Sequence, residues 1–568
     1  MKPLTPRFPT VDRNGFVPAP ESIPPPDVKY RQKVPPGLPV HKHPLNPLAF
    51  LLRGALIYPD HIAIAHPDVK HPAYYTYSVW AQRVQNLAYA LIHFGIKPRD
   101  TVAVLAPNAP MIADAYQAIP AARGVICPIN TRLTPLEIAY ILEHSRAKLI
   151  LVDYEYVHLV KDTKIPAILS NDTGRAGDPY EEFLSQGRRF SRERGWWGLE
   201  PEPDEDAGFA LCYTSGTTGR PKGVLTTLRG TYLGAVANAY ETKMDINSVY
   251  LWVLPMFHAG GWTYPWAATF AVSAQITLRN VSYPLIWNHL RNSSVTHYCG
   301  APTVQIGLVN YPETEKLLKP VTAIIAGSAP TAHLIASLEK IGINPVHTYG
   351  PFTRNHLQES WLALPLEERA KHMARQGYSY TTADGVRVVY QTEDEDLQDV
   401  PQDGKTIGEI VVRGNLVMRE YFTDEKATEK AFKGGYFRSG DLAVMYPDGS
   451  VGIQDRSKDI IISGGENASS LAIEQELVTH PDVLEVAVVA RGHPKWGERP
   501  MAFVTLHPSK TAKWENKHKE FEIDLKAHAR KRLPGFATPE WVAVVPGLPK
   551  TSTGKIQKVE LRKRVAKL

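Results

Sequence analysis

Two kinds of apolar pattern alternate through the first third of this chain, and they restrict what it can fold into. Helix-like periodicity at residues 78–94, 111–124 and 134–144 alternates with short apolar, strand-like runs at 101–105, 125–128 and 149–153. Repeated strand–helix alternation is typical of layered α/β folds, in which mostly parallel sheets are covered by helices. The sequence therefore predicts a large, multi-layered α/β domain at this end of the chain.

A second, smaller domain is expected at the other end. The chain has 568 residues, and single cores rarely grow past about 250–300 residues. The expected elements of the later part are β-type alternation at 407–413, strand, turn, strand and loop over 452–467, a helix at 469–480 and a strand at 485–490. We place the boundary in the charged turn at 455–459. This gives a large domain with α/β sheets over 48–455 and a small, mobile α+β domain over 456–568.

Residues 1–47 read as a proline-rich N-terminal arm. Ten prolines fall between residues 17 and 47, and proline-rich segments favour extended conformations without internal hydrogen bonds. We expect the arm to lie on the surface rather than in the core. The N-terminus has no apolar segment of the secretory type, and no apolar run reaches the roughly 18 residues of a membrane span.

The charge and the cysteines exclude several classes of function. The net charge of +6 is modest, and its basic C-terminal part carries no nucleic-acid-binding pattern, so we predict no nucleic-acid partner. Cys127, Cys212 and Cys299 lie far apart in mostly apolar surroundings. They match neither a metal site nor a disulfide framework and read as buried thiols in a reducing compartment.

The most distinctive motif is Tyr-Thr-Ser-Gly-Thr-Thr-Gly-Arg-Pro-Lys-Gly-Val at 213–224. Its hydroxyls, accessible backbone N–H groups and lysine complement the oxygens of a polyphosphate. It is not the common P-loop, because counting from Gly216 puts Pro221 at the second glycine position, and Gly223 follows Lys222. The alternative is an ordinary turn between strands. The apolar runs on both sides place the motif between buried strands, and the whole string favours phosphate binding.

Further motifs follow along the chain. They are Leu-Pro-Met-Phe-His-Ala-Gly-Gly-Trp at 254–262, Ala-Gly-Ser-Ala-Pro at 326–330, Tyr-Phe-Arg-Ser-Gly-Asp at 436–441, Asp-Arg-Ser-Lys-Asp at 455–459, Ser-Gly-Gly-Glu-Asn at 463–467 and Pro-Lys-Thr-Ser-Thr-Gly-Lys-Ile-Gln at 549–557. With the loop, they resemble the adenylate-forming (AMP-binding) superfamily, most closely its acyl-activating branch of acyl-CoA synthetases. The resemblance implies an ATP-dependent acid–CoA ligase that forms an acyl-adenylate and pyrophosphate, rotates its small domain, and transfers the acyl group to coenzyme A.

The resemblance also assigns residues. Those implied to bind the nucleotide are Thr214, Ser215, Gly216, Thr217, Thr218, Gly219, Lys222, Gly327, Ser328, Ala329, Tyr349, Gly350, Asp441 and Arg456. A carboxylate such as that of Asp441 can accept hydrogen bonds from both ribose hydroxyls. Lys555 is implied as the catalytic cation, since a cation between the acid and the α-phosphate offsets charge that builds in the transition state. His258 is implied to neutralise or gate the approaching carboxylate.

Other roles follow from the same resemblance. Lys458 is the implied hinge, because a short polar turn between domains can absorb a large rotation. Gly464 and Gly465 belong to the loop expected near coenzyme A, and the acyl pocket is expected at Trp262 and Gly327. The aromatic residues Trp262, Tyr264 and Trp266 indicate a bounded pocket for a short-chain, medium-chain or aryl acid. Alternatively, they pack the core.

One block departs from the family pattern. The family continues Tyr-Gly-x-Thr-Glu, in which threonine contacts the α-phosphate and glutamate helps to hold Mg²⁺, whereas residues 349–356 read Tyr-Gly-Pro-Phe-Thr-Arg-Asn-His. Either Thr353 stands one place late and Arg354 replaces the glutamate, or about six residues are missing before Pro351. An error in the sequence at this point would give the same pattern. Expected co-substrates and cofactors are ATP, Mg²⁺ and coenzyme A, with metal ligands unassigned and adenylation weakened.

Two other functions stay open at this point. The chain could be a stand-alone adenylation enzyme that loads a separate carrier protein, or a catalytically impaired relative that binds a nucleotide or an acyl group. The terminal Ala566-Lys567-Leu568 differs from the peroxisomal Ser-Lys-Leu address by one small residue. We therefore predict import into the peroxisome by its receptor, with the cytoplasm as the alternative location.

Overall fold

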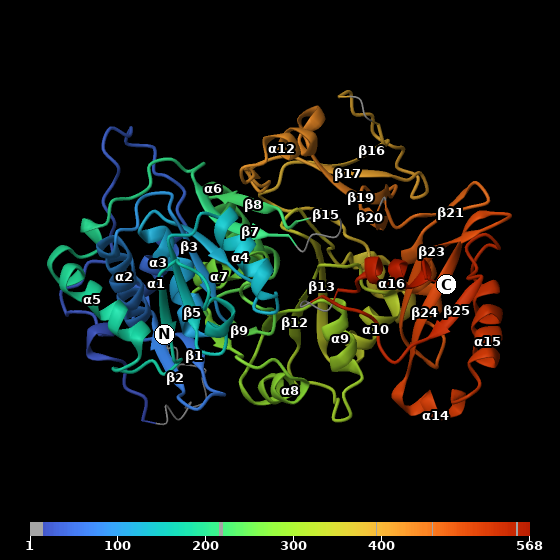
Figure 1. The fold of residues 1–568 in the computed structure, drawn as a ribbon, viewed down its shortest axis with the longest axis horizontal. Coiled ribbons are helices and arrows are strands. Elements are labelled where there is room, and N and C mark those ends of the chain that lie inside the picture. The colour runs from blue at the N-terminus through green and yellow to red at the C-terminus, as the bar shows by residue number, and fades with distance from the viewer. Residues whose placement is uncertain (1–14, 215–219, 393–394, 457, 552–554, 568) are drawn as a thin grey trace.

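The structure is a computed structural model that describes residues 15–214, 220–392, 395–456, 458–551 and 555–567. Two large sheets with flanking helices fill one side of the molecule, a small sheet stands beside them, and the C-terminal unit lies at the opposite end (Figure 1). This is the α/β architecture predicted from the strand–helix alternation. In the part of the chain that the structure describes, no helix has the length and apolar character needed to cross a membrane.

The first large sheet contains the strands predicted from the alternating pattern. Its order is β18-β8-β7-β4-β3-β5-β6. The strands are β3 (Thr101–Leu105), β4 (Val125–Pro128), β5 (Leu149–Asp153), β6 (Ala167–Ser170), β7 (Gly208–Tyr213), β8 (Gly223–Thr227) and β18 (Glu420–Tyr421). Pairing is parallel from β6 to β7, and β8 returns antiparallel beside β7. The distinctive Gly- and Thr-rich motif lies between β7 and β8 in the sequence.

Local signals explain the helices of this layer, which are α2 (Tyr77–Phe94), α3 (Pro110–Ala121) and α4 (Pro135–His144). Thr76 caps the start of α2, where its side chain accepts a hydrogen bond from the Val79 amide. Gly95 caps the end of the helix with a φ of 110°. Thr134 and Glu137 form a capping box at the start of α4. Helix α3 ends before the predicted residue 124, and Arg123 has already turned to a φ of 63°.

The second large sheet places much of the site. Its order is β15-β14-β13-β12-β11-β9-β10-β1-β2. The strands are β1 (Ile62–His66), β2 (Ala73–Thr76), β9 (Val249–Trp252), β10 (Ala274–Thr277), β11 (His297–Cys299), β12 (Val321–Ile325), β13 (Ile343–Tyr349), β14 (Thr353–Arg354) and β15 (Tyr378–Ser379). Its helices are α6 (Leu228–Glu241), α7 (Tyr264–Phe270), α8 (Tyr283–Asn292), α9 (Pro302–Val309) and α10 (Ala332–Lys340). Apolar side chains from both large sheets meet in one continuous core.

Two smaller sheets follow along the chain. One has the order β16-β17-β19-β20 and consists of β16 (Val386–Val389), β17 (Gly408–Val412), β19 (Phe437–Met445) and β20 (Val451–Arg456). The other contains β21 (Ile461–Ser463), β22 (Glu466–Ala468), β23 (Val483–His493), β24 (Gly497–Leu506) and β25 (Trp541–Val544), with α13 (Ser470–Leu477), α14 (Thr511–Trp514), α15 (His518–Arg530) and α16 (Lys558–Val565). The C-terminal unit, which contains this last sheet, has its own apolar core, which includes Ile461, Phe521 and Leu525.

The N-terminal arm contributes more to the interior than its composition predicts. Between residues 15 and 47 regular structure is limited to the short 3₁₀ turn Pro20–Ser22, which fits an extended arm. However, Phe16 is buried against the rings of Tyr74 and Tyr75, and Ser22 is fully buried where it contacts Arg83. The expectation of a purely superficial arm is therefore wrong, because burying an aromatic side chain stabilises the folded state even in a proline-rich segment.

The remaining helices complete the large unit. They are α1 (Leu48–Ile57), α5 (Pro179–Arg194), α11 (Leu366–Met373) and α12 (Glu425–Ala431). Arg83 of α2 forms buried ion pairs with Asp114 of α3, at 2.8 Å, and with Glu181 of α5, at 2.6 Å. Because an unpaired buried charge is costly, this triad fixes the three helices relative to one another.

Candidate active site

A large cavity opens where the second sheet, the Gly- and Thr-rich hairpin and the C-terminal unit meet. Its volume is about 1220 Å³. The ends of β12 and β13, helices α6, α9 and α10, and the strands β19 and β20 supply walls, and α13 and α16 supply the facing wall from the C-terminal unit. Motifs that are far apart in the sequence, except the one at 463–467, therefore contribute residues to one cavity.

The base of the Gly- and Thr-rich loop lies on this cavity. The Thr214 amide donates to the Lys222 carbonyl at 3.0 Å, and the Lys222 amide donates to the Thr214 hydroxyl at 3.2 Å. The Lys222 ammonium lies 4.7 Å from the centre of the Tyr421 ring. Five of the predicted phosphate-binding residues, Ser215, Gly216, Thr217, Thr218 and Gly219, lie outside the described residues. Thr214 itself lines the cavity.

His258 begins the 3₁₀ helix His258–Thr263 that follows β9. Burial, together with the charge of Lys555, lowers the pKa of His258 to about 4. At this pKa the imidazole is neutral near pH 7. An approaching carboxylate raises the pKa of a neighbouring histidine, so both implied roles of His258 stay predictions.

Trp262 and Gly327, the two residues predicted at the acyl pocket, lie next to each other. A Cβ atom on Gly327 would lie 3.9 Å from the Trp262 ring. Gly327 has a φ of 88°, in the left-handed region that glycine occupies without strain. Trp262 and Tyr264 both line the cavity, whereas Trp266 is buried against Tyr116. The prediction of aromatic lining thus fits two of the three residues, and the core-packing alternative fits the third.

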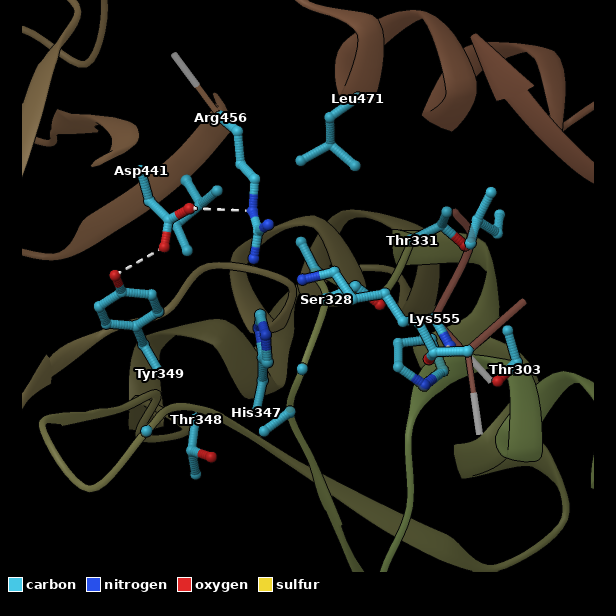
Figure 2. Close-up of a pocket in the computed structure, with 18 of the residues that line it drawn as sticks. Thr303, Ser328, Thr331, His347, Thr348, Tyr349, Asp441, Arg456, Leu471 and Lys555 are labelled. Atoms are coloured by element: carbon cyan, nitrogen blue, oxygen red, sulfur yellow. Dashed lines mark hydrogen bonds and ion pairs between the residues drawn. The ribbon is translucent and has the colours of Figure 1, made fainter. Parts of the chain in front are cut away.

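The turn after β12 and the end of β13 form the next part of the wall. Gly327, Ser328 and Ala329 line the cavity beside Tyr349 and Gly350. Figure 2 shows Ser328 between the Asp441–Arg456 pair and Lys555. Small residues in such a turn let a flat ligand approach the backbone closely.

Asp441 is oriented by two neighbours. It pairs in register with Arg456 across β19 and β20, and the Arg456 guanidinium lies 3.3 Å from its carboxylate. The Tyr349 hydroxyl donates to the second carboxylate oxygen at 2.8 Å, a contact drawn in Figure 2. Burial and the Asp441 charge raise the pKa of Tyr349 well above its usual value, so the hydroxyl stays protonated as a donor. Each carboxylate oxygen keeps a further lone pair for a ligand.

Lys555 enters the same cavity from the C-terminal unit, near Thr303 and Thr331 (Figure 2). Its amide donates to the Thr551 hydroxyl at 3.1 Å, and its carbonyl accepts from the Thr551 amide at 2.7 Å. Burial, reinforced by the charge of Arg456, lowers the pKa of Lys555 to about 8. At neutral pH the side chain is therefore a largely protonated cation that is poorly screened by water, well suited to stabilise developing negative charge.

Other predicted residues lie at the edge of this cavity or outside it. Lys458 lines the cavity, and its carbonyl accepts a hydrogen bond from Arg562 at 3.2 Å. Gly464 and Gly465 form the turn between β21 and β22, with φ values of 64° and 90°, and are not part of the cavity wall. Ala566 and Lys567 are exposed at the end of α16, and Leu568 lies outside the described residues.

Residues 349–356, the block that differs from the family pattern, make a tight turn instead of a longer loop. The Phe352 amide donates to the Tyr349 carbonyl, and β14 returns antiparallel to β13. Thr353 is fully buried, and the Arg354 guanidinium lies 3.4 Å from the buried Glu241 carboxylate. Neither residue lines the cavity. Arg354 therefore does not reach the cavity in place of the glutamate. A deletion before Pro351 and an error in the sequence at this point both stay predictions.

The carboxylates that line the cavity are all engaged by other groups. Asp441 contacts Tyr349 and Arg456, Asp455 accepts from Ser470, Asp459 contacts Arg562, Glu474 contacts Lys558, Glu485 contacts Lys550, and Glu560 contacts Lys563. Among the described residues, no group of three or more His, Cys, Asp and Glu side chains is arranged to hold a metal ion. These residues do not fit a divalent cation held directly by the protein.

Helix α6 supplies cavity residues that the motifs do not indicate. Thr231 and Asn238 line the cavity. The side-chain amide of Asn238 donates to the Trp262 carbonyl at 3.1 Å and to the Thr263 hydroxyl at 2.5 Å. Trp262 and Thr263 both have positive φ, at 54° and 65°. Such left-handed backbone is strained for non-glycine residues and is held here by Asn238. No sequence signal distinguishes Asn238 from other polar helix residues.

Comparison with known proteins gives a consistent result at every level. Residues 53–422 match the model of the AMP-binding enzyme family, and residues 472–555 match that of the AMP-binding enzyme C-terminal domain. A peroxisomal acetate/butyrate–CoA ligase of Arabidopsis thaliana is 37% identical over 566 residues, which cover 94% of this chain and 96% of that protein. A peroxisomal trans-cinnamate:CoA ligase of Petunia hybrida is 38% identical over 553 residues, which cover 91% of this chain and 94% of that protein.

A solved structure supports the same fold. The ATP-bound RpMatB-BxBclM chimera superposes with a TM-score of 0.78 at 24% sequence identity, over 92% of this chain and 99% of that chain. At this identity the likeness concerns the fold of both the large unit and the C-terminal unit.

Proposed function

The chain belongs to the family of AMP-binding enzymes, and from this premise we propose that it is an ATP-dependent acid–CoA ligase. It activates a carboxylic acid as the acyl-adenylate, releases pyrophosphate and transfers the acyl group to coenzyme A. The observation that carries the proposal is the meeting of Asp441, Arg456 and Lys555 around one cavity, beside Thr214 at the base of the Gly- and Thr-rich loop. His258 lies within electrostatic range of Lys555. The relatives named as acid–CoA ligases along almost the whole chain support it.

The charges around the cavity suit the first step. Arg456 and Lys555 lie within electrostatic range of one another, and each favours binding of an anionic triphosphate. Lys555 supplies positive charge where the acid oxygen and the α-phosphate meet. The neutral His258 lets the negatively charged acid approach without holding it as an ion pair. Negative charge that develops during adenylation is therefore met mainly by Lys555.

The aromatic side chains at the cavity support a class of acid as the substrate. Trp262 and Tyr264 line it, and Gly327 faces Trp262. Aromatic walls suit a short-chain, medium-chain or aryl acid, and relatives named for acetate, butyrate and cinnamate support this range. A panel of these acids, assayed for pyrophosphate release and for loss of free CoA thiol, tests the proposal. Thioester formation with one or more of them is expected. Binding of ATP without acid-dependent pyrophosphate release would favour the catalytically impaired relative instead.

Magnesium is the part of the usual reaction that this cavity does not accommodate. Each carboxylate that lines the cavity already contacts another protein group, and among the described residues no three His, Cys, Asp or Glu side chains form a ligand set. A metal ion could arrive only with the phosphates of ATP, with water and loop hydroxyls as its other contacts. This misfit is the observation that favours a weakened enzyme over a fully active one.

Replacing Asp441 with asparagine is expected to weaken ATP binding. Loss of a charged acceptor for the ribose hydroxyls raises the KM for ATP by about ten- to a hundredfold, the usual effect of a hydrogen bond to a charged group. Steady-state kinetics with ATP varied measures it. Asp399→Asn is a matched control, because this exposed carboxylate pairs with Arg387 away from the cavity. Equal effects of the two variants would remove Asp441 from the nucleotide site.

We propose the peroxisome as the location and its import receptor as a partner. The terminal Ala566-Lys567-Leu568 and the relatives named as peroxisomal support this. Deletion of residues 566–568 from a chain tagged at its N-terminus is expected to leave the protein in the cytosol, whereas the undeleted chain collects in peroxisomes. Fluorescence microscopy of the two forms measures this. Peroxisomal import of the shortened chain would show that the address lies elsewhere.

A further inference from the structure

A series of polar contacts joins β20, the strand that precedes the implied hinge at Lys458, to the segment that carries Lys555. Asp455 lies at the end of β20, three residues before the hinge Lys458. Its carboxylate accepts hydrogen bonds from the Ser470 amide and from the Ser470 hydroxyl, both at 2.6 Å. Ser470 is the first residue of α13 and is fully buried, and Asp455 is also buried. The contact therefore bridges the two sides of the hinge.

The chain of contacts continues to the catalytic segment. The Lys558 ammonium donates to the Ser470 hydroxyl at 2.6 Å and lies 2.7 Å from the Glu474 carboxylate. The Ser470 hydroxyl thus accepts from Lys558 while it donates to Asp455, which uses its donor and one acceptor site. Lys558 is the first residue of α16 and stands three residues after Lys555. Fixing Lys558 fixes the depth at which Lys555 enters the cavity.

A second serine strengthens the same junction. The Ser469 hydroxyl donates to the Gln454 carbonyl at 2.6 Å and caps α13 by accepting from the Ala472 amide at 2.9 Å. Both serines at the start of α13 therefore bind the end of β20. Because β20 belongs to a sheet of the large unit, these contacts hold the C-terminal unit in the orientation that inserts Lys555.

We propose that Ser470 is a positioning residue for adenylation, which links Asp455 to Lys558 and so holds Lys555 in the cavity. The inference rests on the proposed ligase function and on rotation about Lys458. Rotation moves Ser470 relative to Asp455, because the two residues lie on opposite sides of the hinge. The Asp455–Ser470–Lys558 chain of contacts therefore belongs to the adenylating orientation and must break before transfer to coenzyme A.

The decisive variant is Ser470→Ala, assayed in two half-reactions. Acid-dependent pyrophosphate release is expected to fall about ten- to a hundredfold, as for loss of hydrogen bonds to charged groups. Thioester formation from supplied acyl-adenylate and CoA is expected to remain at the unaltered rate, since that step uses the other orientation. Thr538→Ala is the matched control, because it removes a buried hydroxyl of the same unit whose partner among the described residues is local, the Pro534 carbonyl. It should change neither half-reaction.

A second pair of variants guards against misfolding of Ser470→Ala. Lys558→Met is expected to lose the same half-reaction, and Lys558→Arg to recover part of it, because arginine keeps the charge that contacts Glu474. Equal loss of both half-reactions in Ser470→Ala and Lys558→Met would show a merely structural role and overturn the proposal. So would unchanged pyrophosphate release in both.

A conformational readout separates this proposal from the proposed function. Trypsin cleavage at Arg456 and Lys458 reports how firmly the hinge is held, and we expect Ser470→Ala to be cut faster than the unaltered protein. If the unaltered protein releases no pyrophosphate with any acid, the ligase function fails. The proteolysis comparison still decides whether Ser470 holds the hinge, and equal cleavage rates would refute it.

Discussion

Replacement of Lys555 by alanine is expected to slow acyl-adenylate formation by about a hundred- to a thousandfold, the usual effect of removing one transition-state charge partner. The reason is local. Lys555 is half-buried near Arg456 at the cavity, so its charge acts on the reacting oxygens with less screening than at an open surface. Acid-dependent pyrophosphate release measures the effect. Thioester formation from supplied acyl-adenylate should be preserved, because Lys555 acts only in the first step.

A neighbouring lysine provides the control. Lys563 lies on α16, is exposed and pairs with Glu560. Lys563→Ala should leave both half-reactions unchanged. If Lys555→Ala and Lys563→Ala had the same activity, the account of Lys555 as the catalytic cation would be wrong.

The rate of adenylation is expected to decrease as the pH rises. Burial and Arg456 lower the pKa of Lys555 to about 8, so the required ammonium is present below this pH and is lost as pH rises through it. The kcat/KM for adenylation, which reports groups of the free enzyme, is therefore expected to fall on the alkaline side of pH 8. In Lys555→Arg the guanidinium stays charged, so this alkaline fall should disappear even though the rate is lower.

Insertion of the missing block is expected to produce the second large effect. Six residues, Leu-Thr-Glu-Thr-Tyr-Gly, placed between Gly350 and Pro351 restore the family pattern. Gly350 is exposed in a turn, so the added residues can extend into solvent and toward the cavity. We expect pyrophosphate release to rise by about tenfold or more and to saturate at lower Mg²⁺, because a carboxylate ligand for the metal is supplied.

The matched control carries Gln in place of Glu within the inserted block. It keeps the length and shape of the loop but provides no carboxylate, so it should not lower the Mg²⁺ requirement. Rapid turnover of the unaltered protein at ordinary Mg²⁺, with no gain from the insertion, would show that the gap does not limit catalysis.

The fold and the site differ in how far the sequence predicts them. The strands at 101–105, 125–128 and 149–153 follow directly from apolar runs, and the structure has them at these residues. His258, Asp441 and Lys555 stand in separate motifs, each of which identifies a chemical group without its neighbours. The resemblance to a family joined these motifs. In the structure Asp441 and Lys555 line one cavity, and His258 lies within electrostatic range of Lys555.

Contacts made by single polar residues could not be predicted in this way. The Tyr349 hydroxyl reaches Asp441 only because β13 and β19 come together in space. Arg354 looks like a site residue in an alignment, yet the tight turn after Tyr349 directs it to Glu241. Ser470 has an ordinary helix-start pattern, and its link to Asp455 depends on how the two units pack. Such contacts depend on tertiary packing, which leaves no local signal.

The most direct test of the central claim is a product analysis of one reaction. The unaltered protein is incubated with ATP, Mg²⁺, CoA and each acid of the short-chain and aryl panel, and AMP, pyrophosphate and acyl-CoA are quantified together. We expect the three products in equal amounts, formed only when an acid is present and strongly reduced in Lys555→Ala. Acyl-CoA formation that is unaffected by Lys555→Ala, or the absence of acid-dependent AMP with every acid, would contradict it.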